Sequence, residues 1–224
     1  AGLLLRCNCR KNTTVNAQGC RGVYQPNGPI QGDGSSCPRD TIVDGLTVVN
    51  DINQPLYDTL KNSGTYVIGL GTNRTERLAA ATDESLFKQK ATELIDRIRS
   101  SEVSPNATIY WVNLSLSNKT AEAERNRVIA ELVTEKSIRL IDWSTHVTTT
   151  NSNASTTDDI TFADSVHHDA AGYRKKVAFV AEAIGQAPAG SFSSNSSFSC
   201  TNYKEIGSGP TNILTRTYSA KIQS

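Results

Sequence analysis

The run Thr65-Tyr-Val-Ile-Gly-Leu70, closed by Gly71, predicts a short buried strand, because its apolar residues follow one another without polar alternation. The segments that follow alternate between two patterns: helical stripes over 83–100 and 120–136, and strand-like apolar runs over 107–112 and 137–143. Strands that alternate with helices of this length predict an α/β fold, in which helices cover both faces of a central parallel sheet. The expected arrangement is therefore three-layered, α/β/α.

The chain divides into a domain over residues 1–187 and a C-terminal tail over 188–224. Asp169 is expected to cap the last helix of the domain, which Gly185 would end. The tail is rich in Ser, Asn and Thr, and one stretch, 212–222, has the pattern of an extended strand. We expect it to form an edge strand or a solvated wrap, or to mediate self-association by adding to the sheet of a neighbouring molecule.

The net charge gives no reason to expect a nucleic-acid partner, and the hydropathy gives no reason to expect a membrane-spanning helix. Lys and Arg total 23 against 22 acidic residues, for a net charge of +1, so nothing favours a nucleic acid. The sequence has no apolar run of about 18 residues, the length that a bilayer-spanning helix requires.

The cysteines and glycosylation triplets both indicate an extracytoplasmic protein. Four of the five cysteines lie in the first 37 residues, and Cys7-x-Cys9 is too tight for a zinc site, so disulfides pinning the N-terminal region are expected and no metal is. Because the number of cysteines is odd, one thiol would remain outside these disulfides. Seven Asn-x-Ser/Thr triplets begin at Asn12, Asn73, Asn106, Asn113, Asn118, Asn153 and Asn195. The alternative explanation of these triplets is a merely polar surface.

Two motifs predict a site at one edge of the sheet. Asp164-Ser-Val-His167 would let a carboxylate orient an imidazole base, and Asn73 follows the first predicted strand, where its amide could bind an oxyanion. Ligand sites of parallel sheets lie beyond the carboxyl ends of the strands, and both motifs fall there. The neighbouring polar residues are given structural roles: His168 is expected to face solvent, His146 to be structural or exposed, and Asp142 to make a hydrogen bond at a strand end.

These residues resemble the SGNH (GDSL-type) hydrolase superfamily, and more narrowly its extracellular peptidoglycan O-acetyltransferase domains. The resemblance covers 66–183 and rests on three segments in order, Gly69-Leu-Gly-Thr-Asn73, Leu140-Ile-Asp-Trp143 and Asp164-Ser-Val-His167 with the following Ala170-Ala-Gly-Tyr173. It implies a flavodoxin-like sheet and a serine nucleophile after the opening strand. It also implies that His167 is the base, Asp164 its orienter and Asn73 an oxyanion donor.

The nucleophile departs from the family pattern. Where Gly-Asp-Ser would stand, Leu3-Leu-Leu is followed by Arg6-Cys-Asn-Cys9, and the spacing places Cys9, or alternatively Asn8, at the position of the serine. The segment Gly32-Asp-Gly-Ser35 offers Ser35 as a rival, with Gly32 or Gly34 as the backbone oxyanion donor. The third alternative is that no competent nucleophile exists, because Cys9 is held in a disulfide.

Two functions remain open on these grounds. The first is an extracytoplasmic carbohydrate esterase or O-acetyltransferase that acts on acyl esters of cell-surface glycans and needs no cofactor. The second is a catalytically inactive glycoprotein of the same fold, which serves as a cell-surface structural, filament or assembly component. The missing Gly-Asp-Ser favours the second, and the Asp164–His167 pair favours the first.

Overall fold

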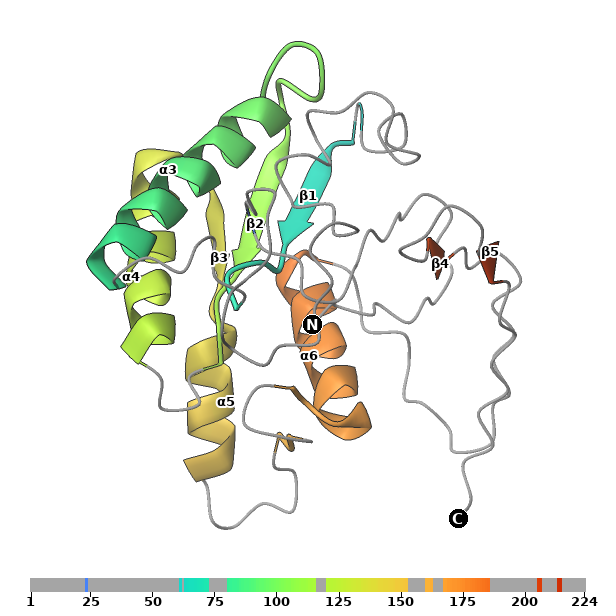
Figure 1. Ribbon diagram of the computed structural model, residues 1–224. Coiled ribbons are helices and arrows are strands. Elements are labelled where there is room, and N and C mark those ends of the chain that lie inside the picture. Colours follow the sequence, from blue (N-terminus) through green and yellow to red (C-terminus); the bar gives the residue numbers. More distant parts are fainter. Residues whose placement is uncertain are drawn as a thin grey trace.

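The computed structural model describes residues 23, 61, 63–72, 80–115, 120–152, 160–162, 167–185, 205–206 and 213–214. Within these residues the chain forms an α/β fold with a three-stranded parallel sheet and four helices (Figure 1). The strands are β1 (Thr65–Ile68), β2 (Thr108–Val112) and β3 (Arg139–Ile141), and the helices are α3 (Ala80–Ile98), α4 (Thr120–Glu135), α5 (Trp143–Ser152) and α6 (Ala170–Ala183). A separate antiparallel pair joins β4 (Glu205–Ile206) and β5 (Ile213–Leu214).

The sheet runs in the order β1-β2-β3, with every pair parallel. Thr65 is in register with Thr108, and Tyr110 with Arg139. Parallel neighbours cannot be joined by a tight hairpin, so each connection needs a crossover, and the crossovers here contain α3 and α4. The predicted alternation of strands and helices is confirmed over this part of the chain.

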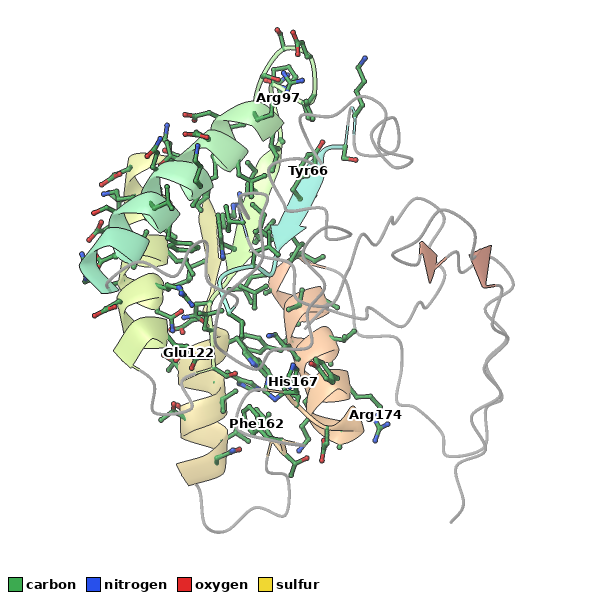
Figure 2. All side chains as sticks on the ribbon, in the orientation of Figure 1. Tyr66, Arg97, Glu122, Phe162, His167 and Arg174 are labelled. Carbon is green, nitrogen blue, oxygen red and sulfur yellow. The ribbon has the colours of Figure 1, made fainter. Side chains whose placement is uncertain are left out.

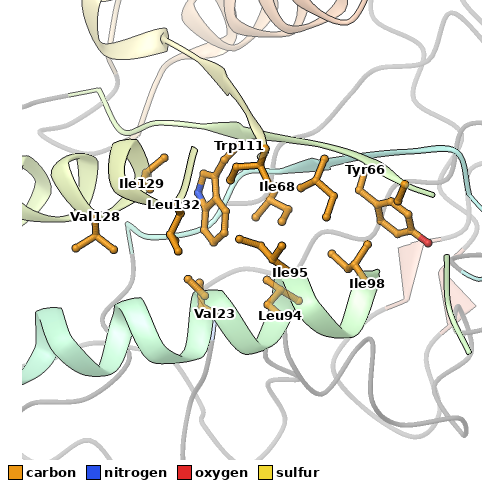
Figure 3. Close-up of a cluster of buried hydrophobic side chains, with 14 of the residues drawn as sticks. Val23, Tyr66, Ile68, Leu94, Ile95, Ile98, Trp111, Val128, Ile129 and Leu132 are labelled. Carbon is orange, nitrogen blue, oxygen red and sulfur yellow. The ribbon is translucent and has the colours of Figure 1, made fainter. Parts of the chain in front are cut away.

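Residues on one face of the sheet pack against α3 and α4. Trp111 is fully buried there (Figure 3). Its ring meets that of Phe87 edge to face at a centroid distance of 6.1 Å. Ile68 from β1, Ile95 from α3 and Leu132 from α4 belong to the same cluster. This face is apolar because side chains along a strand alternate between the two faces, and alternate positions of β1 and β2 carry aliphatic or aromatic groups.

A second buried cluster joins residues of the sheet to α5 and α6. Val112 and Ile141 from the sheet are buried with Trp143 and Val147 of α5 and Val180 of α6. The two Trp residues therefore belong to different clusters.

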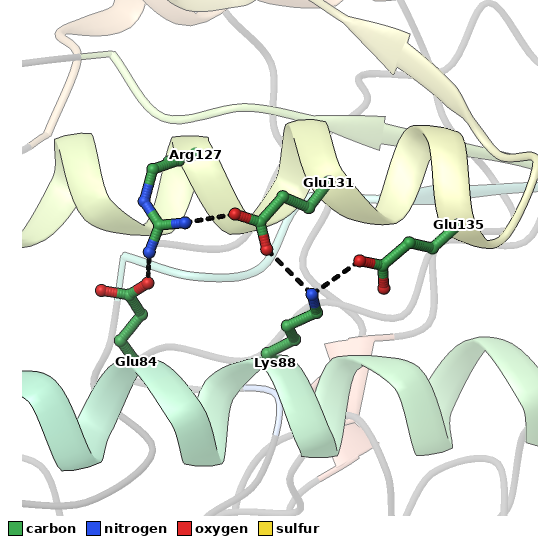
Figure 4. A network of polar contacts seen from close by, with 5 residues as sticks. All are labelled: Glu84, Lys88, Arg127, Glu131 and Glu135. Carbon is green, nitrogen blue, oxygen red and sulfur yellow. Dashed lines mark hydrogen bonds and ion pairs between the residues drawn. The ribbon is translucent and has the colours of Figure 1, made fainter.

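An ion-pair network crosses the solvent side of the α3–α4 seam. Lys88 of α3 binds Glu131 and Glu135 of α4 at 2.9 and 2.7 Å, and Arg127 of α4 binds Glu84 and Glu131 (Figure 4). Partly exposed pairs of this kind contribute only about 0–1 kcal/mol each. Their main effect is to fix which helix turns lie opposite one another.

The element boundaries differ from the predictions in two places. Helix α3 begins at Ala80, earlier than the predicted start at residue 83. The chain turns into α5 directly after β3, whereas the sequence predicted a strand continuing to Trp143 and no helix there. Helix α4 is confirmed, as is α6, in which the Asp169 side chain accepts a hydrogen bond from the Gly172 N–H at 2.8 Å and Gly185 follows the last turn.

The tail forms strand β5 inside the predicted 212–222 segment, and β5 pairs with β4 of the same chain. All five cysteines and the boundary at residues 187 and 188 lie outside the described residues. The expectations about disulfides, domain division and self-association therefore remain predictions.

Candidate active site

All three strands of the parallel sheet end at the same edge. The arrowheads of β1 and β2 point toward α5 and α6, and the chain leaves this edge through residues 69–72 after β1, Asn113 after β2 and Asp142 after β3 (Figure 1). Parallel sheets bind their ligands beyond this edge. The candidate site therefore consists of the segments that meet at this edge.

The ends of β2 and β3 are joined by a buried amide–carboxylate contact. Asn113, which is 7% exposed, donates from Nδ2 to Oδ1 of Asp142 at 2.7 Å, and its own Oδ1 accepts from the backbone N–H of Ser144 at 2.8 Å. The same Asp142 oxygen accepts from the Thr145 N–H at 3.1 Å, so Asp142 caps the start of α5. For Asn113 the sequence predicted only a glycosylation triplet, whereas the hydrogen-bonding role of Asp142 is confirmed.

Asp142 stays ionised in this setting. Burial raises the pKa of its carboxyl group, but the hydrogen bonds from Asn113 and Thr145 outweigh that effect and hold the pKa below its usual value. The junction therefore combines a fixed negative charge with two donors, and it sets the direction in which α5 leaves the sheet.

A buried arginine holds the segment after β1. Arg125 of α4, which is 3% exposed, donates from Nη1 to the carbonyl oxygens of Gly71 and Thr72 at 2.7 and 3.3 Å. The Trp111 indole donates to the Leu70 carbonyl at 3.0 Å. Gly71 has a φ of 130°, which side chains rarely tolerate, so glycine is required at this bend. Three consecutive carbonyls are thus fixed immediately before Asn73 in the sequence.

The segment that contains His167 is closed at both ends. Phe162 and His168 form an antiparallel bridge, and the Asp169 N–H donates to the Thr161 carbonyl at 3.2 Å. Gly172 lies so close to this closure that a Cβ atom there would come within 2.3 Å of the Thr161 oxygen, so the first turn of α6 needs a glycine. The two ends of the segment are therefore held together at the start of α6.

His168 is 5% exposed, so the expectation that it faces solvent is wrong. Its Nε2 atom accepts a hydrogen bond from Nε1 of Trp143, which is fully buried, at 3.0 Å. An indole N–H can only donate, so Nε2 carries no proton and the neutral ring holds its proton on Nδ1. This contact could not be predicted from the sequence, because the two residues are 25 positions apart and His168 follows another histidine.

The surroundings of His168 keep it neutral. Burial is the main cause that lowers its pKa to about 4, and the Lys176 ammonium acts in the same direction, while the Thr161 carbonyl and the Asp169 carboxylate oppose it. Lys176 lies 5.6 Å from the centre of the Trp143 ring, and burial lowers its own pKa to about 8. Lys176 therefore remains cationic throughout the acid range in which His168 would gain a proton.

This neutrality makes folding sensitive to acid. The pKa of His168 falls from 6.5 in the unfolded chain to about 4 in the fold, so the stabilisation is complete above pH 6.5 and is lost as the pH falls toward 4. We expect the loss to amount to about 2–3 kcal/mol. Urea unfolding of wild type and His168→Gln between pH 7 and 4 measures it. Parallel pH profiles for the two proteins would contradict the assignment to His168.

His167 is exposed, directly before the buried His168 (Figure 2). In the figure it lies beside α6 and near Phe162, on the side of the sheet toward which the strands run. His146, the third histidine, stacks on Phe179 with ring centroids 4.2 Å apart, in agreement with a structural role. Of the three imidazoles, that of His167 is therefore the most exposed.

The other predicted site residues lie outside the described residues. These are Asp164, Asn73, Gly32, Gly34, Cys9 and Ser35. Of the predicted set the structure places His167, and it places Thr72, directly before Asn73, and Phe162, two residues before Asp164. The distances within the predicted triad and oxyanion hole therefore remain predictions.

Comparison with known proteins found no family model, no curated protein and no solved structure that matches the chain at a significant level. Among the described residues, no group of three or more His, Cys, Asp and Glu side chains could hold a metal ion. The described helices include none with the length and apolar character needed to cross a membrane.

Proposed function

We propose that the chain is an extracytoplasmic SGNH-type esterase or O-acetyltransferase that acts on acyl esters of cell-surface glycans. The observation that carries the proposal is the exposed His167 at the carboxyl edge of a parallel sheet, next in sequence to a histidine anchored in the core. The complete fold in this proposal is a three-layer α/β/α sandwich whose N-terminal region is pinned by disulfides. Two separate buried clusters support it, one that joins the strands to α3 and α4 and one that joins the strands to α5 and α6.

In the proposed reaction, His167 takes the proton from a serine hydroxyl or cysteine thiol as the serine oxygen or cysteine sulfur attacks the ester carbonyl. Asp164 orients the imidazole and stabilises its charged form. The Asn73 amide and the Gly34 N–H bind the oxyanion of the tetrahedral intermediate. The C–O bond to the leaving alcohol breaks, and His167 returns the proton to that alcohol. Water, or a sugar hydroxyl, then attacks the acyl-enzyme in the same way and releases an acid or a new ester.

Ester turnover and covalent labelling together test the proposal and identify the nucleophile. Purified protein is assayed with 4-nitrophenyl acetate and an acetylated oligosaccharide, then labelled with a fluorophosphonate or with iodoacetamide and mapped by peptide mass spectrometry. We expect turnover of both esters and stoichiometric labelling at Ser35 or Cys9, blocked by prior acylation. A folded protein that shows neither turnover nor labelling would overturn the proposal.

A non-catalytic role is the second proposal, and the sequence at the opening strand favours it. Arg6-Cys-Asn-Cys9 stands where a nucleophile of this class would carry Gly-Asp-Ser, so Cys9 could be consumed in a disulfide that pins the N-terminal region. In that case the fold would serve as a cell-surface structural or assembly component, with the tail strand as its contact. Non-reducing peptide mapping distinguishes the two: a bridged Cys9 together with an unlabelled Ser35 supports the non-catalytic role.

A further inference from the structure

The feature that carries a further inference is the attachment of the His167 segment to the sheet through His168. The backbone bridge between Phe162 and His168 closes the segment, and the imidazole of His168 then ties that closure to Trp143 at 3.0 Å. Trp143 is the first residue of α5 and follows Asp142. Asp142 accepts a hydrogen bond from Asn113, which comes directly after β2. A continuous set of hydrogen bonds and peptide links thus runs from the sheet to His167.

We propose that His168 is a positioning residue: as its Nδ1–H tautomer it fastens the His167 segment to the carboxyl end of β3 through Trp143, and so sets the direction in which His167 points. The inference rests on the proposed function only in naming His167 as the base. The attachment itself can be tested whether or not the protein turns over an ester.

The backbone explains how a contact at His168 acts on His167. In extended chain, neighbouring side chains point to opposite sides, and His168 takes part in a β-bridge. Holding the His168 ring inward therefore directs the His167 ring outward, which matches the burial of the first and the exposure of the second. Without the hydrogen bond between His168 and Trp143, the β-bridge alone does not determine which of the two adjacent imidazoles faces the solvent.

The contact also discriminates between replacement side chains. Glutamine can place an uncharged acceptor oxygen about where Nε2 lies, so His168→Gln retains the bond to the indole. Leucine fills similar space without an acceptor, so His168→Leu leaves the buried Trp143 N–H without a partner. Trp143→Phe removes the donor from the other side. His146→Gln is the matched control, because His146 also lies against the Trp143 ring, with centroids 5.4 Å apart, but is not the residue that binds its N–H.

The kinetic test compares these variants with 4-nitrophenyl acetate as the probe. We expect His168→Leu and Trp143→Phe each to lower kcat about 10- to 100-fold, with KM within about threefold of wild type, because a displaced base slows the chemical step more than binding. His168→Gln and His146→Gln should stay within about threefold. The double variant should lose little more than either single variant, because both remove one interaction. An active wild type with unchanged kcat in His168→Leu would overturn the inference.

A second readout does not depend on turnover. The chain has only 3 histidines, so nitrogen-15 spectra of histidine-labelled protein can assign each tautomer, and His168 should show the Nδ1–H form in wild type. Hydrogen exchange of the 162–169 peptide should speed up about tenfold or more in His168→Leu and remain unchanged in His168→Gln. Equal exchange in both variants overturns the attachment, whereas an inactive wild type with the expected exchange overturns only the proposed function.

Discussion

Replacing His167 with asparagine is expected to lower kcat for ester hydrolysis by about a thousandfold, because general-base catalysis by a positioned side chain contributes about 10²–10⁴ in rate. Asparagine keeps a polar side chain of similar reach but cannot take the proton from the nucleophile. The free energy of unfolding should change by less than about 0.5 kcal/mol, since His167 is exposed. Initial rates with 4-nitrophenyl acetate and urea unfolding curves measure the two quantities.

Glu182→Gln is the matched control for this experiment, because Glu182 is exposed near the opposite end of α6. Its rates should equal those of wild type. Asp164→Asn should fall between the two, since it leaves the base in place and removes the group that orients it. Full activity in His167→Asn would remove His167 from the reaction and leave the non-catalytic role as the better account of the fold.

Replacing Asn113 with leucine is expected to destabilise the fold by about 3–5 kcal/mol, because a buried N–H loses its acceptor and an ionised carboxylate loses a donor. The lost contacts are those to the Ser144 N–H and to Asp142. At about 2–4 °C per kcal/mol, the melting temperature should drop by roughly 6–20 °C. Calorimetry and urea titration measure the change.

Asn106→Leu provides the matched control. Asn106 also heads an Asn-x-Ser/Thr triplet but is exposed in the turn before β2, so its replacement should cost less than about 0.5 kcal/mol. The same pair makes a prediction about glycosylation. In protein secreted from a glycosylating host, a glycan can occupy Asn106, whereas both ends of the Asn113 amide are engaged inside the fold. A folded protein with a glycan on Asn113 would contradict the described junction.

The repeating elements could be predicted from the sequence because each carries its own signal. Helix α6 has a capping aspartate, an apolar stripe and a terminal glycine, and the runs that became β1 and β2 are uninterrupted. Helix α5 has no comparable signal, because residues 143–152 are rich in threonine, a poor helix former. It forms because Asp142 caps its first turn, which is a local contact, and because Trp143 and Val147 are buried, which depends on tertiary structure.

The candidate site was predictable only in part, for a similar reason. The spacing of Asp164 and His167 is local, so the motif could be recognised from the sequence alone. The contacts that hold the site are not local: Asn113 meets Asp142 across 29 positions and Arg125 reaches Gly71 across 54. A glycosylation triplet at Asn113 also argued for a surface position. Adjacent histidines give no indication of which one is buried until the position of Trp143 is known.

The ion pairs along the α3–α4 seam have a consequence for how a substrate would approach. The cations Lys88, Arg127 and Lys136 lie among the carboxylates of Glu84, Glu131, Glu135 and Asp96. Opposite charges so closely interleaved nearly cancel beyond a Debye length of about 8 Å at physiological salt. The electrostatic attraction of a charged polysaccharide toward this flank would therefore be small. Within the described part of the chain, the α3–α4 flank is therefore expected to contribute little to the long-range attraction of a charged ligand.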